Sequence, residues 1–270
     1  MWGQPPPAVL SSEARRLFLG VRQINTTIQS PHFDFVFQLL HSDLRPMLAP
    51  ASPRLLRPLD RAFFARSPRR VARELLGKIL VRDGKPRRAA RIVEVEAYLG
   101  ENDPAAHAAA GNTARTSVLF GPPGYAYVYF IYGNHNCLNV SCERQGKAGS
   151  VLFRALEPLE GIEEMVRARG IVLRDLRDLP KLTSGPGRLA QAFGITRSRD
   201  NGCDLTSPAS GLWIAEDGFR AKQIQITPRI GISKAADQPL RYVLAGNACI
   251  SGRRTPAGDL RPRSRLDKRV

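Results

Sequence analysis

Hydrophobic and polar residues alternate most regularly over residues 91–98. Val and Ile recur there at every second position, and this period of two predicts a β-strand. The alternation places Glu94, Glu96 and Tyr98 on the same face. Two carboxylates inside one strand are unusual, because ionised groups avoid a protein interior unless they are paired or used. The pattern therefore allows two interpretations: a half-exposed strand whose acids face water, or a partly buried strand that carries a general base beside an aromatic ring.

Shorter periodic segments predict the remaining elements between residues 59 and 251. Residues 70–80 predict a helix that ends at Gly77 and passes into a strand, and Asp83-Gly84 predicts the hairpin from that strand to residues 90–98. Further strands are expected over 125–131, 137–142, 150–156, 212–215, 223–226 and 240–245. Helices are expected over 158–169 and 187–193, and a long loop over 99–124.

The pattern fades towards both ends of the chain. Residues 1–52 open with a run of three prolines, lack a sustained period and end in a Pro-rich joint after Met47. We expect this arm to be poorly ordered, with Met47 a candidate for the true start. Residues 253–270 hold seven Lys or Arg and two Asp, and such basic blocks are usually disordered. Three segments are thus predicted: an arm over 1–52, a compact domain over 53–252 and a basic tail over 253–270.

The charge balance points to a polyanionic partner. The 270 residues include 41 Lys or Arg and 24 Asp or Glu, which gives a net charge of +17. Such a charge favours nucleic acid first and an anionic membrane surface second. No apolar run approaches the ~18 residues of a membrane-spanning helix. The four cysteines and four histidines lack the spacing of a structural zinc site, and nothing in the sequence demands disulfides, which suits a reducing compartment.

Tyrosines are concentrated in one predicted hairpin. Four of the six tyrosines lie within residues 125–132. A row of tyrosines on one strand face suits a wall for base stacking, although ordinary core aromatics give the same pattern. Tyr132 differs, because it stands where the strand gives way to a Gly-Asn turn. An aromatic side chain at a hairpin tip is better explained as a wedge than by packing.

Three other features carry candidate chemistry. Arg154 lies inside an apolar strand and needs an anion, for which Glu96 is a candidate; a structural salt bridge is the alternative. His107 follows the acidic strand in a loop, where a lone histidine is commonly structural. Residues 184–188 form a Gly-rich turn that enters a helix and can bind phosphate through backbone N–H groups, although the turn lacks the spacing of a Walker A motif.

These segments, in this order, resemble the 3-methyladenine (alkyladenine) DNA glycosylase family. The stretches that carry the resemblance are 76–77, 91–100, 105–107, 127–139, 154–161, 184–189 and 228–232, so it covers about residues 60–250. It implies a monofunctional base-excision-repair enzyme. Such an enzyme flips an alkylated or deaminated purine out of duplex DNA and hydrolyses the N-glycosidic bond with a Glu-activated water.

The resemblance also implies roles for individual residues. Glu96 matches the general base, and Arg154 and the main-chain carbonyl of Ile230 match the other groups that hold the attacking water. Arg154 is expected to lower the pKa of Glu96. Glu94 is assigned a structural role.

The implied DNA contacts fall into three groups. Tyr98, His107, Tyr129 and Asn139 match residues of the base pocket, and Tyr132 matches the residue that fills the gap left by the flipped nucleotide. Contacts to the DNA backbone are expected from Arg115, Ser184, Gly185, Gly187 and Arg188. No metal or cofactor is expected.

We therefore predict a single α/β (α+β) domain with a curved, mainly antiparallel sheet, a protruding β-hairpin and peripheral helices. The expected partner is double-stranded DNA containing damaged purines, with no membrane association and a monomeric state. The expected location is the cytoplasm at a bacterial nucleoid, or the nucleus or an organelle in a eukaryote. Two alternatives remain: a DNA- or RNA-binding module without catalysis, and a carbohydrate glycosidase that uses Glu94 and Glu96 as its acid pair.

Overall fold

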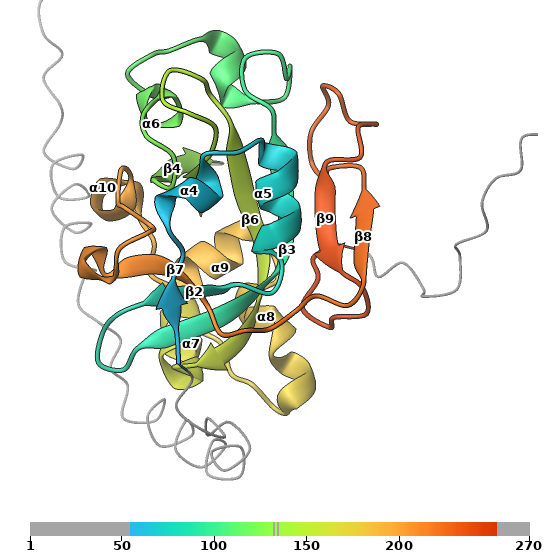
Figure 1. The fold of residues 1–270 in the computed structure, drawn as a ribbon. Coiled ribbons are helices and arrows are strands. Elements are labelled where there is room, and N and C mark those ends of the chain that lie inside the picture. Colours follow the sequence, from blue (N-terminus) through green and yellow to red (C-terminus); the bar gives the residue numbers. More distant parts are fainter. Residues whose placement is uncertain (1–54, 132, 134, 253–270) are drawn as a thin grey trace, which may run out of the picture. The chain divides into compact units, whose positions relative to one another are not determined.

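The computed structural model describes residues 55–252, except Tyr132 and Asn134 (Figure 1). The predictions for the arm, for the tail beyond residue 252 and for Tyr132 therefore lie outside the described residues. The described strands are β1 (Arg57–Pro58), β2 (Ile79–Arg82), β3 (Arg88–Tyr98), β4 (Ala126–Ile131), β5 (His135–Ser141), β6 (Ser150–Glu160), β7 (Leu212–Glu216), β8 (Ile224–Thr227) and β9 (Arg241–Leu244). All of their pairings are antiparallel, in one curled sheet. The predicted architecture is thus confirmed.

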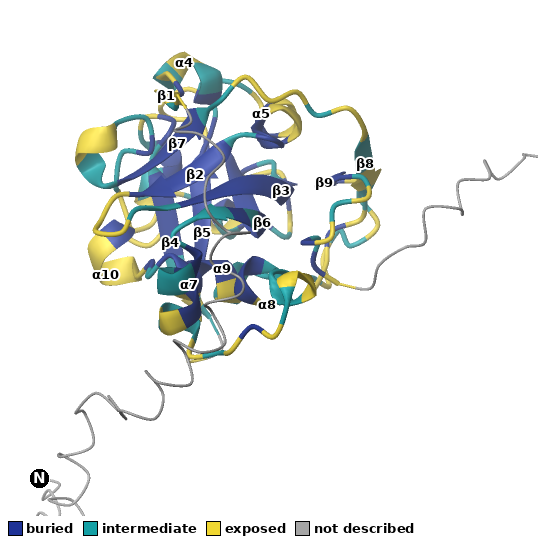
Figure 2. Ribbon diagram, turned by 90° about the horizontal axis from the view of Figure 1, so that it is seen from below, coloured by how far each residue is buried: buried dark blue, intermediate teal, exposed yellow. Residues whose placement is uncertain are grey.

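Short helices cover both faces of this sheet. They are α4 (Arg61–Phe64), α5 (Pro68–Leu75), α6 (Ser117–Phe120), α7 (Ile162–Arg169), α8 (Pro180–Thr183), α9 (Pro186–Ala192) and α10 (Arg197–Asp200), with 3₁₀ turns at His107–Ala110, Leu176–Asp178 and Pro208–Ser210. Figure 2 shows α4 and α5 on one side of the sheet and α7, α8 and α9 on the other. In this part of the chain, no helix is long and apolar enough to cross a membrane.

Strand β3 occupies the centre of the sheet. The main path runs β1-β7-β2-β3-β6-β5-β4, and β9 joins β3 beside β2. One edge of β3 thus pairs with β6, while the other edge pairs first with β2 and then with β9, opposite Glu94 and Glu96. Register shifts on either side of Glu94 interrupt the regular alternation. Neither carboxylate has any exposed surface, so the interpretation of a half-exposed strand is wrong.

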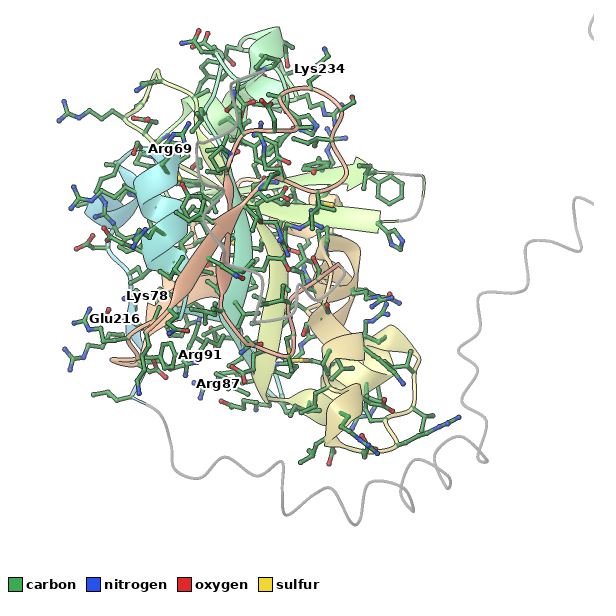
Figure 3. The ribbon with its side chains drawn as sticks, turned by 90° about the vertical axis from the view of Figure 1, so that its right-hand side faces the viewer. Arg69, Lys78, Arg87, Arg91, Glu216 and Lys234 are labelled. Carbon is green, nitrogen blue, oxygen red and sulfur yellow. The ribbon has the colours of Figure 1, made fainter. Side chains whose placement is uncertain are left out.

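The predicted hairpins are present. Gly77 follows α5 with φ +89°, and a Cβ there would lie 2.6 Å from the ring of Phe219, so any other residue would be strained at this position. Strands β2 and β3 form the hairpin predicted at Asp83-Gly84. Strands β4 and β5 form the tyrosine hairpin, which extends away from the sheet in Figure 3.

Two element predictions need correction. The helix predicted over 158–169 begins only at Ile162, because β6 continues to Glu160 before Gly161 turns the chain with φ +70°. Pro158 is accommodated in β6 next to a register shift, where the regular ladder is already broken. The loop predicted over 99–124 contains a 3₁₀ turn and α6.

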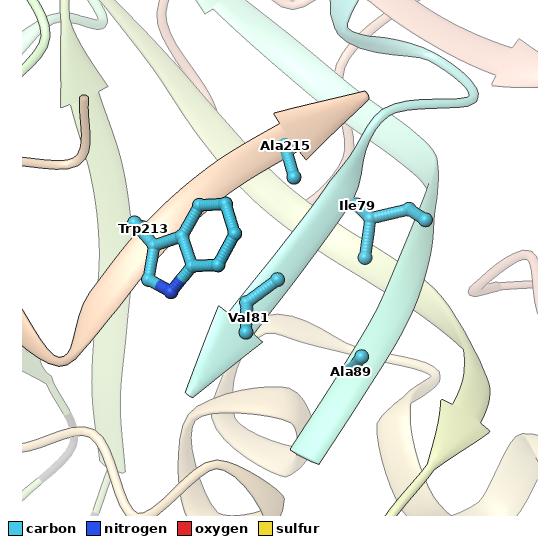
Figure 4. Close-up of a cluster of buried hydrophobic side chains, with 5 residues drawn as sticks. All are labelled: Ile79, Val81, Ala89, Trp213 and Ala215. Atoms are coloured by element: carbon cyan, nitrogen blue, oxygen red, sulfur yellow. The ribbon is translucent and has the colours of Figure 1, made fainter. Parts of the chain in front are cut away.

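An apolar cluster fixes the β2–β3 hairpin against β7. It consists of Ile79, Val81, Ala89, Trp213 and Ala215, which lie together in Figure 4. The indole N–H of Trp213 donates to Asp83 at 2.8 Å, so the one polar atom of this ring is satisfied at the hairpin turn. The cluster thereby anchors the start of the strand that carries both buried acids.

Candidate active site

A cavity of about 410 Å³ opens beside the tyrosine hairpin. Its lining comes from β3, β4, β5 and β6, from residues 105–119 between β3 and β4, from the start of α9 and from residues 230–232. Pockets for small ligands begin at roughly 300 Å³ and are mostly apolar with a few placed polar groups, which describes this cavity. Nine of the predicted site residues line it: Tyr98, His107, Tyr129, Asn139, Arg154, Gly185, Gly187, Arg188 and Ile230.

Glu96 lies behind this lining with no exposed surface. Its Oε1 accepts a hydrogen bond from the main-chain N–H of Ile230 at 2.8 Å, and its Oε2 accepts one from the Tyr98 hydroxyl at 3.0 Å. The Arg154 guanidinium lies 3.3 Å from Oε1 and also donates to the carbonyl of Ile230 at 3.4 Å. The two strands and the loop thus bring together the three groups predicted for the catalytic role.

Burial raises the pKa of Glu96 above its usual value. Arg154, the Ile230 N–H and the Tyr98 hydroxyl favour the ionised form, but they do not offset the loss of water around the carboxylate. Arg154 acts in the expected direction, whereas the net direction is upward. Burial and the neighbouring Glu96 also raise the pKa of Tyr98, so its hydroxyl keeps the proton that it donates. A carboxylate with a raised pKa is a stronger proton acceptor, as a general base requires.

Glu94 has different partners, although it stands only two residues away. Its Oε1 accepts from Arg154 Nε at 3.0 Å, from Arg241 Nε at 2.6 Å and from the Ser251 hydroxyl at 2.9 Å. It is fully buried and is not part of the cavity lining. This environment fits the structural role assigned to Glu94, which holds Arg154 in place. Neither Glu94 nor Glu96 is among the lining residues, so the carbohydrate-glycosidase alternative lacks an acid pair that flanks the cavity.

Three aromatic side chains form one wall of the cavity. The His107 Nδ1 lies 3.0 Å from the Tyr127 hydroxyl, and the His107 and Tyr129 rings meet edge to face with centroids 4.5 Å apart. Burial, aided by the positive charge of Arg115, lowers the pKa of His107, so the imidazole is neutral at pH 7. Tyr127 was not among the predicted site residues, although the period of β4 places it on the same strand face as Tyr129.

The hairpin partner strand β5 supplies further lining residues. Asn139 stands opposite Tyr127 in the β4–β5 register and donates to the Tyr127 carbonyl at 3.3 Å. His135 and Cys137 also line the cavity, and neither was predicted. Within the described residues, no group of three or more His, Cys, Asp or Glu side chains is arranged to hold a metal ion.

The residues predicted to contact the DNA backbone surround the opening only in part. Gly185, Gly187 and Arg188 belong to the lining, and Arg115 is exposed beside the Tyr127 hydroxyl. The Ser184 hydroxyl instead donates to the carbonyl of Ile250 at 3.2 Å.

Gly187 has a packing reason as well. A Cβ at this position would lie 2.9 Å from the imidazole of His135, so the glycine lets that ring approach the start of α9.

Comparison with known proteins places most of the described residues in one family. Residues 62–248 match the family described as methylpurine-DNA glycosylase (MPG). A protein of Koribacter versatilis is 61% identical over 200 residues, which cover 74% of this chain and 95% of that protein. A protein of Rhodopseudomonas palustris (strain HaA2) is 49% identical over 203 residues, which cover 75% of this chain and 94% of that protein. A protein of Methanocella arvoryzae is 47% identical over 199 residues, which cover 72% of this chain and 96% of that protein. All three bear the name "Putative 3-methyladenine DNA glycosylase". The matched region includes every residue that lines the cavity.

Proposed function

Since the chain belongs to the methylpurine-DNA glycosylase family, we propose that it removes alkylated or deaminated purines from duplex DNA by hydrolysing the N-glycosyl bond. Residues 53–252 are the proposed glycosylase domain, with the arm 1–52 and the tail 253–270 outside it. One observation carries the mechanism. The buried Glu96 carboxylate accepts hydrogen bonds from Tyr98 and Ile230 and forms an ion pair with Arg154, and all three of these residues line an aromatic cavity.

The cavity is suited to a flipped base. An enzyme cannot reach the glycosidic bond of a base inside the stack, and extrusion costs least for damaged or mispaired bases. Alkylation at N3 or N7 gives a purine a positive charge, and a cationic ring is attracted to tyrosine faces by about 0.5–2 kcal/mol. Tyr127 and Tyr129 supply such faces, and Asn139 supplies a polar group beside them. Tyr132 fills the space that the flipped nucleotide leaves in the duplex.

Hydrolysis breaks the bond between C1′ of the sugar and the purine nitrogen, and the base leaves with the bonding electrons. A cationic alkylated purine thereby leaves as the neutral base, whereas hypoxanthine leaves as an anion that takes a proton from water. A water oxygen attacks C1′, and Glu96 takes the proton of that water. Arg154 and the Ile230 carbonyl hold the water, and the anionic carboxylate stabilises the oxocarbenium-like sugar. The products are a free base and an abasic site.

The lining also favours hydrolysis without strand cleavage. Strand cleavage by a glycosylase requires an amine that forms a Schiff base with the sugar. No lysine belongs to the described lining of the cavity. The protein is therefore proposed to be monofunctional. It acts as a monomer without a cofactor, in the cytoplasm, where it reaches the nucleoid DNA.

The proposal is tested by base release from three substrates. These are duplexes with a single hypoxanthine, duplexes with a single ethenoadenine, and methylated DNA. The purified protein is expected to release free base and to leave sites that break only after alkali treatment. Breaks without alkali would contradict the monofunctional mechanism. Binding of duplex DNA without release from any of these substrates would indicate the noncatalytic DNA-binding alternative.

A further inference from the structure

A second buried ion pair lies close to Glu96. The carboxylate of Asp103 and the guanidinium of Arg229 have no exposed side-chain surface and form two parallel hydrogen bonds, of 2.6 and 2.9 Å. Arg229 also donates to the carbonyl of Ala97 at 3.1 Å, and its guanidinium lies over the Tyr98 ring, 4.6 Å from the centroid. Bidentate pairs of this kind fix direction as well as distance.

The pair connects two loops that approach Glu96 from different parts of the chain. Asp103 belongs to the loop after β3, and it also accepts hydrogen bonds from the N–H groups of Leu99 and Ala105. Arg229 belongs to the segment between β8 and β9 and directly precedes Ile230. The ion pair thus connects the end of β3, the strand that carries Glu96, to the residue before Ile230, whose N–H donates to the Glu96 carboxylate.

No helix or strand of the described residues holds Ile230 in this orientation. Residues 228–240 contain no helix or strand, and Ile230 is 37% exposed. Both main-chain polar groups of Ile230 nevertheless belong to the site, since its N–H donates to Glu96 and its carbonyl accepts from Arg154. Without an anchor, a segment of this kind samples many conformations.

We propose that the Asp103–Arg229 pair positions the catalytic centre by holding the Ile230 main chain against Glu96 and Arg154. The inference rests on the proposed function and goes beyond it, because neither side chain reacts. The pair governs the chemical step, and binding of the duplex does not depend on it. A displacement of about 1 Å at a reacting centre lowers a rate by about 100-fold, which sets the scale of the effect.

The pH dependence separates this role from general stabilisation. The Ile230 N–H favours the ionised form of Glu96, so its loss raises the pKa of Glu96 further. The acid limb of the excision rate then moves to higher pH. The other charged or titratable groups around Glu96 are Tyr98 and Glu94 on β3, Arg154 on β6 and Arg241 on β9.

The chain provides a matched control in the pair Arg91–Asp217. This pair is also buried and bidentate, with hydrogen bonds of 3.2 and 2.8 Å. Arg91 donates to the carbonyl of Gly77 at 2.7 Å and lies over the Phe219 ring at 4.1 Å, which reproduces the arrangement around Arg229. Figure 3 shows Arg91 beside Lys78 and Glu216, well away from Lys234 in the 228–240 segment.

The experiment compares Asp103→Asn with Asp217→Asn in the full chain. Single-turnover release of hypoxanthine is measured across pH, together with affinity for undamaged duplex and urea unfolding. Both variants are expected to unfold at a lower urea concentration than the wild-type protein. Asp103→Asn alone is expected to lose about 10- to 100-fold in rate and to move the acid limb to higher pH, with unchanged affinity for duplex.

A milder variant keeps the test decisive if Asp103→Asn does not fold. Arg229→Lys retains the charge but loses the bidentate geometry, and it is expected to change the rate and the acid limb in the same direction. The positioning role would be overturned if Asp103→Asn had the same rate and the same acid limb as Asp217→Asn. If Asp103→Asn does not fold, the same comparison is made with Arg229→Lys. Absence of release by the wild-type protein would instead contradict the proposed function.

Discussion

At the scale of single residues, two glutamates on one strand have opposite environments. Glu94 and Glu96 are both fully buried. Glu94 accepts hydrogen bonds from Arg154, Arg241 and Ser251, whereas burial outweighs the partners of Glu96 and raises its pKa. When the partners of a buried carboxylate do not make up for the water it has lost, the ionised group lowers the stability of the fold and binds a proton more strongly. In the proposed mechanism, the poor compensation that makes Glu96 a stronger base also lowers the stability of the fold.

Substitution of the two glutamates should separate these roles. The folded-state pKa of Glu96 is raised, so the folded protein favours the protonated carboxyl. The stability that this protonated group contributes is fully present below the unfolded-state pKa, and it is lost as the pH rises through the folded-state pKa. Above the folded-state pKa the ionised Glu96 thus opposes folding, and Glu96→Gln should leave the free energy of unfolding unchanged or higher there. Glu94→Gln should lower it by about 3–5 kcal/mol, because it removes the carboxylate paired with buried Arg241 and leaves Arg154 with Glu96 alone. Urea unfolding at pH 7 measures both, and equal losses would contradict the account.

The sequence indicated the residues whose chemistry is unusual for their position. Two acids in a strand, an arginine in an apolar strand and a tyrosine-rich hairpin indicated the region of the site, and the family resemblance then selected Glu96 and Tyr129. Arg154 and Tyr129 line the cavity, and Glu96 lies directly behind it. The Asp103–Arg229 pair was missed, because its members stand 126 residues apart and each is ordinary in its own loop. Only the folded chain shows that they meet beside the site.

At the scale of elements, the period-two alternation along the strands did not reveal that helices cover both faces of the sheet. Alternation in β3 allowed either a half-exposed or a partly buried strand, but helices lie on both sides of the sheet and the strand is buried from Ala89 to Ala97. Similarly, the acidic start of the predicted helix over 158–169 did not show that β6 extends to Glu160. Pairing with β3 decided that boundary, and such pairing is a tertiary interaction.

The turn that ends β3 gives a prediction at this scale. Gly100 has φ +88°, and a Cβ there would lie 2.1 Å from the backbone oxygen of Ala148. Gly111 has φ +78° with nothing within 4 Å of such a Cβ, so it controls for backbone strain alone. Gly111→Ala should cost about 1–3 kcal/mol of unfolding free energy, and Gly100→Ala clearly more, because backbone atoms must also move. Chemical denaturation of both variants checks this, and equal losses would show that the contact with Ala148 is unimportant.

At the scale of the whole molecule, the proposed function assigns the encounter with DNA to net charge and the chemical step to the cavity. The net charge of +17 attracts the phosphate backbone irrespective of sequence or damage. Binding should therefore weaken steeply as salt increases, while the single-turnover rate at saturating enzyme should change little.

Removal of the basic tail tests this division. Residues 253–270 carry seven Lys or Arg and two Asp, so a chain ending at residue 252 should bind undamaged duplex more weakly and with a shallower dependence on salt. Its saturated excision rate should equal that of the full chain. A chain lacking residues 1–52 is the companion variant, and it should retain excision. Loss of the saturated rate in either truncated chain would show that chemistry depends on a terminal segment.

The role of Glu96 is tested most directly by single-turnover release of hypoxanthine from a duplex, measured across pH with wild type and Glu96→Gln. The wild-type rate should fall as pH falls, with a midpoint above the usual glutamate value of about 4.3, because burial raises the pKa of Glu96. At pH 7 the Glu96→Gln variant should bind the duplex as wild type does and release the base about 10²- to 10⁴-fold more slowly. Release at the wild-type rate by Glu96→Gln would contradict the assignment of Glu96 as the general base.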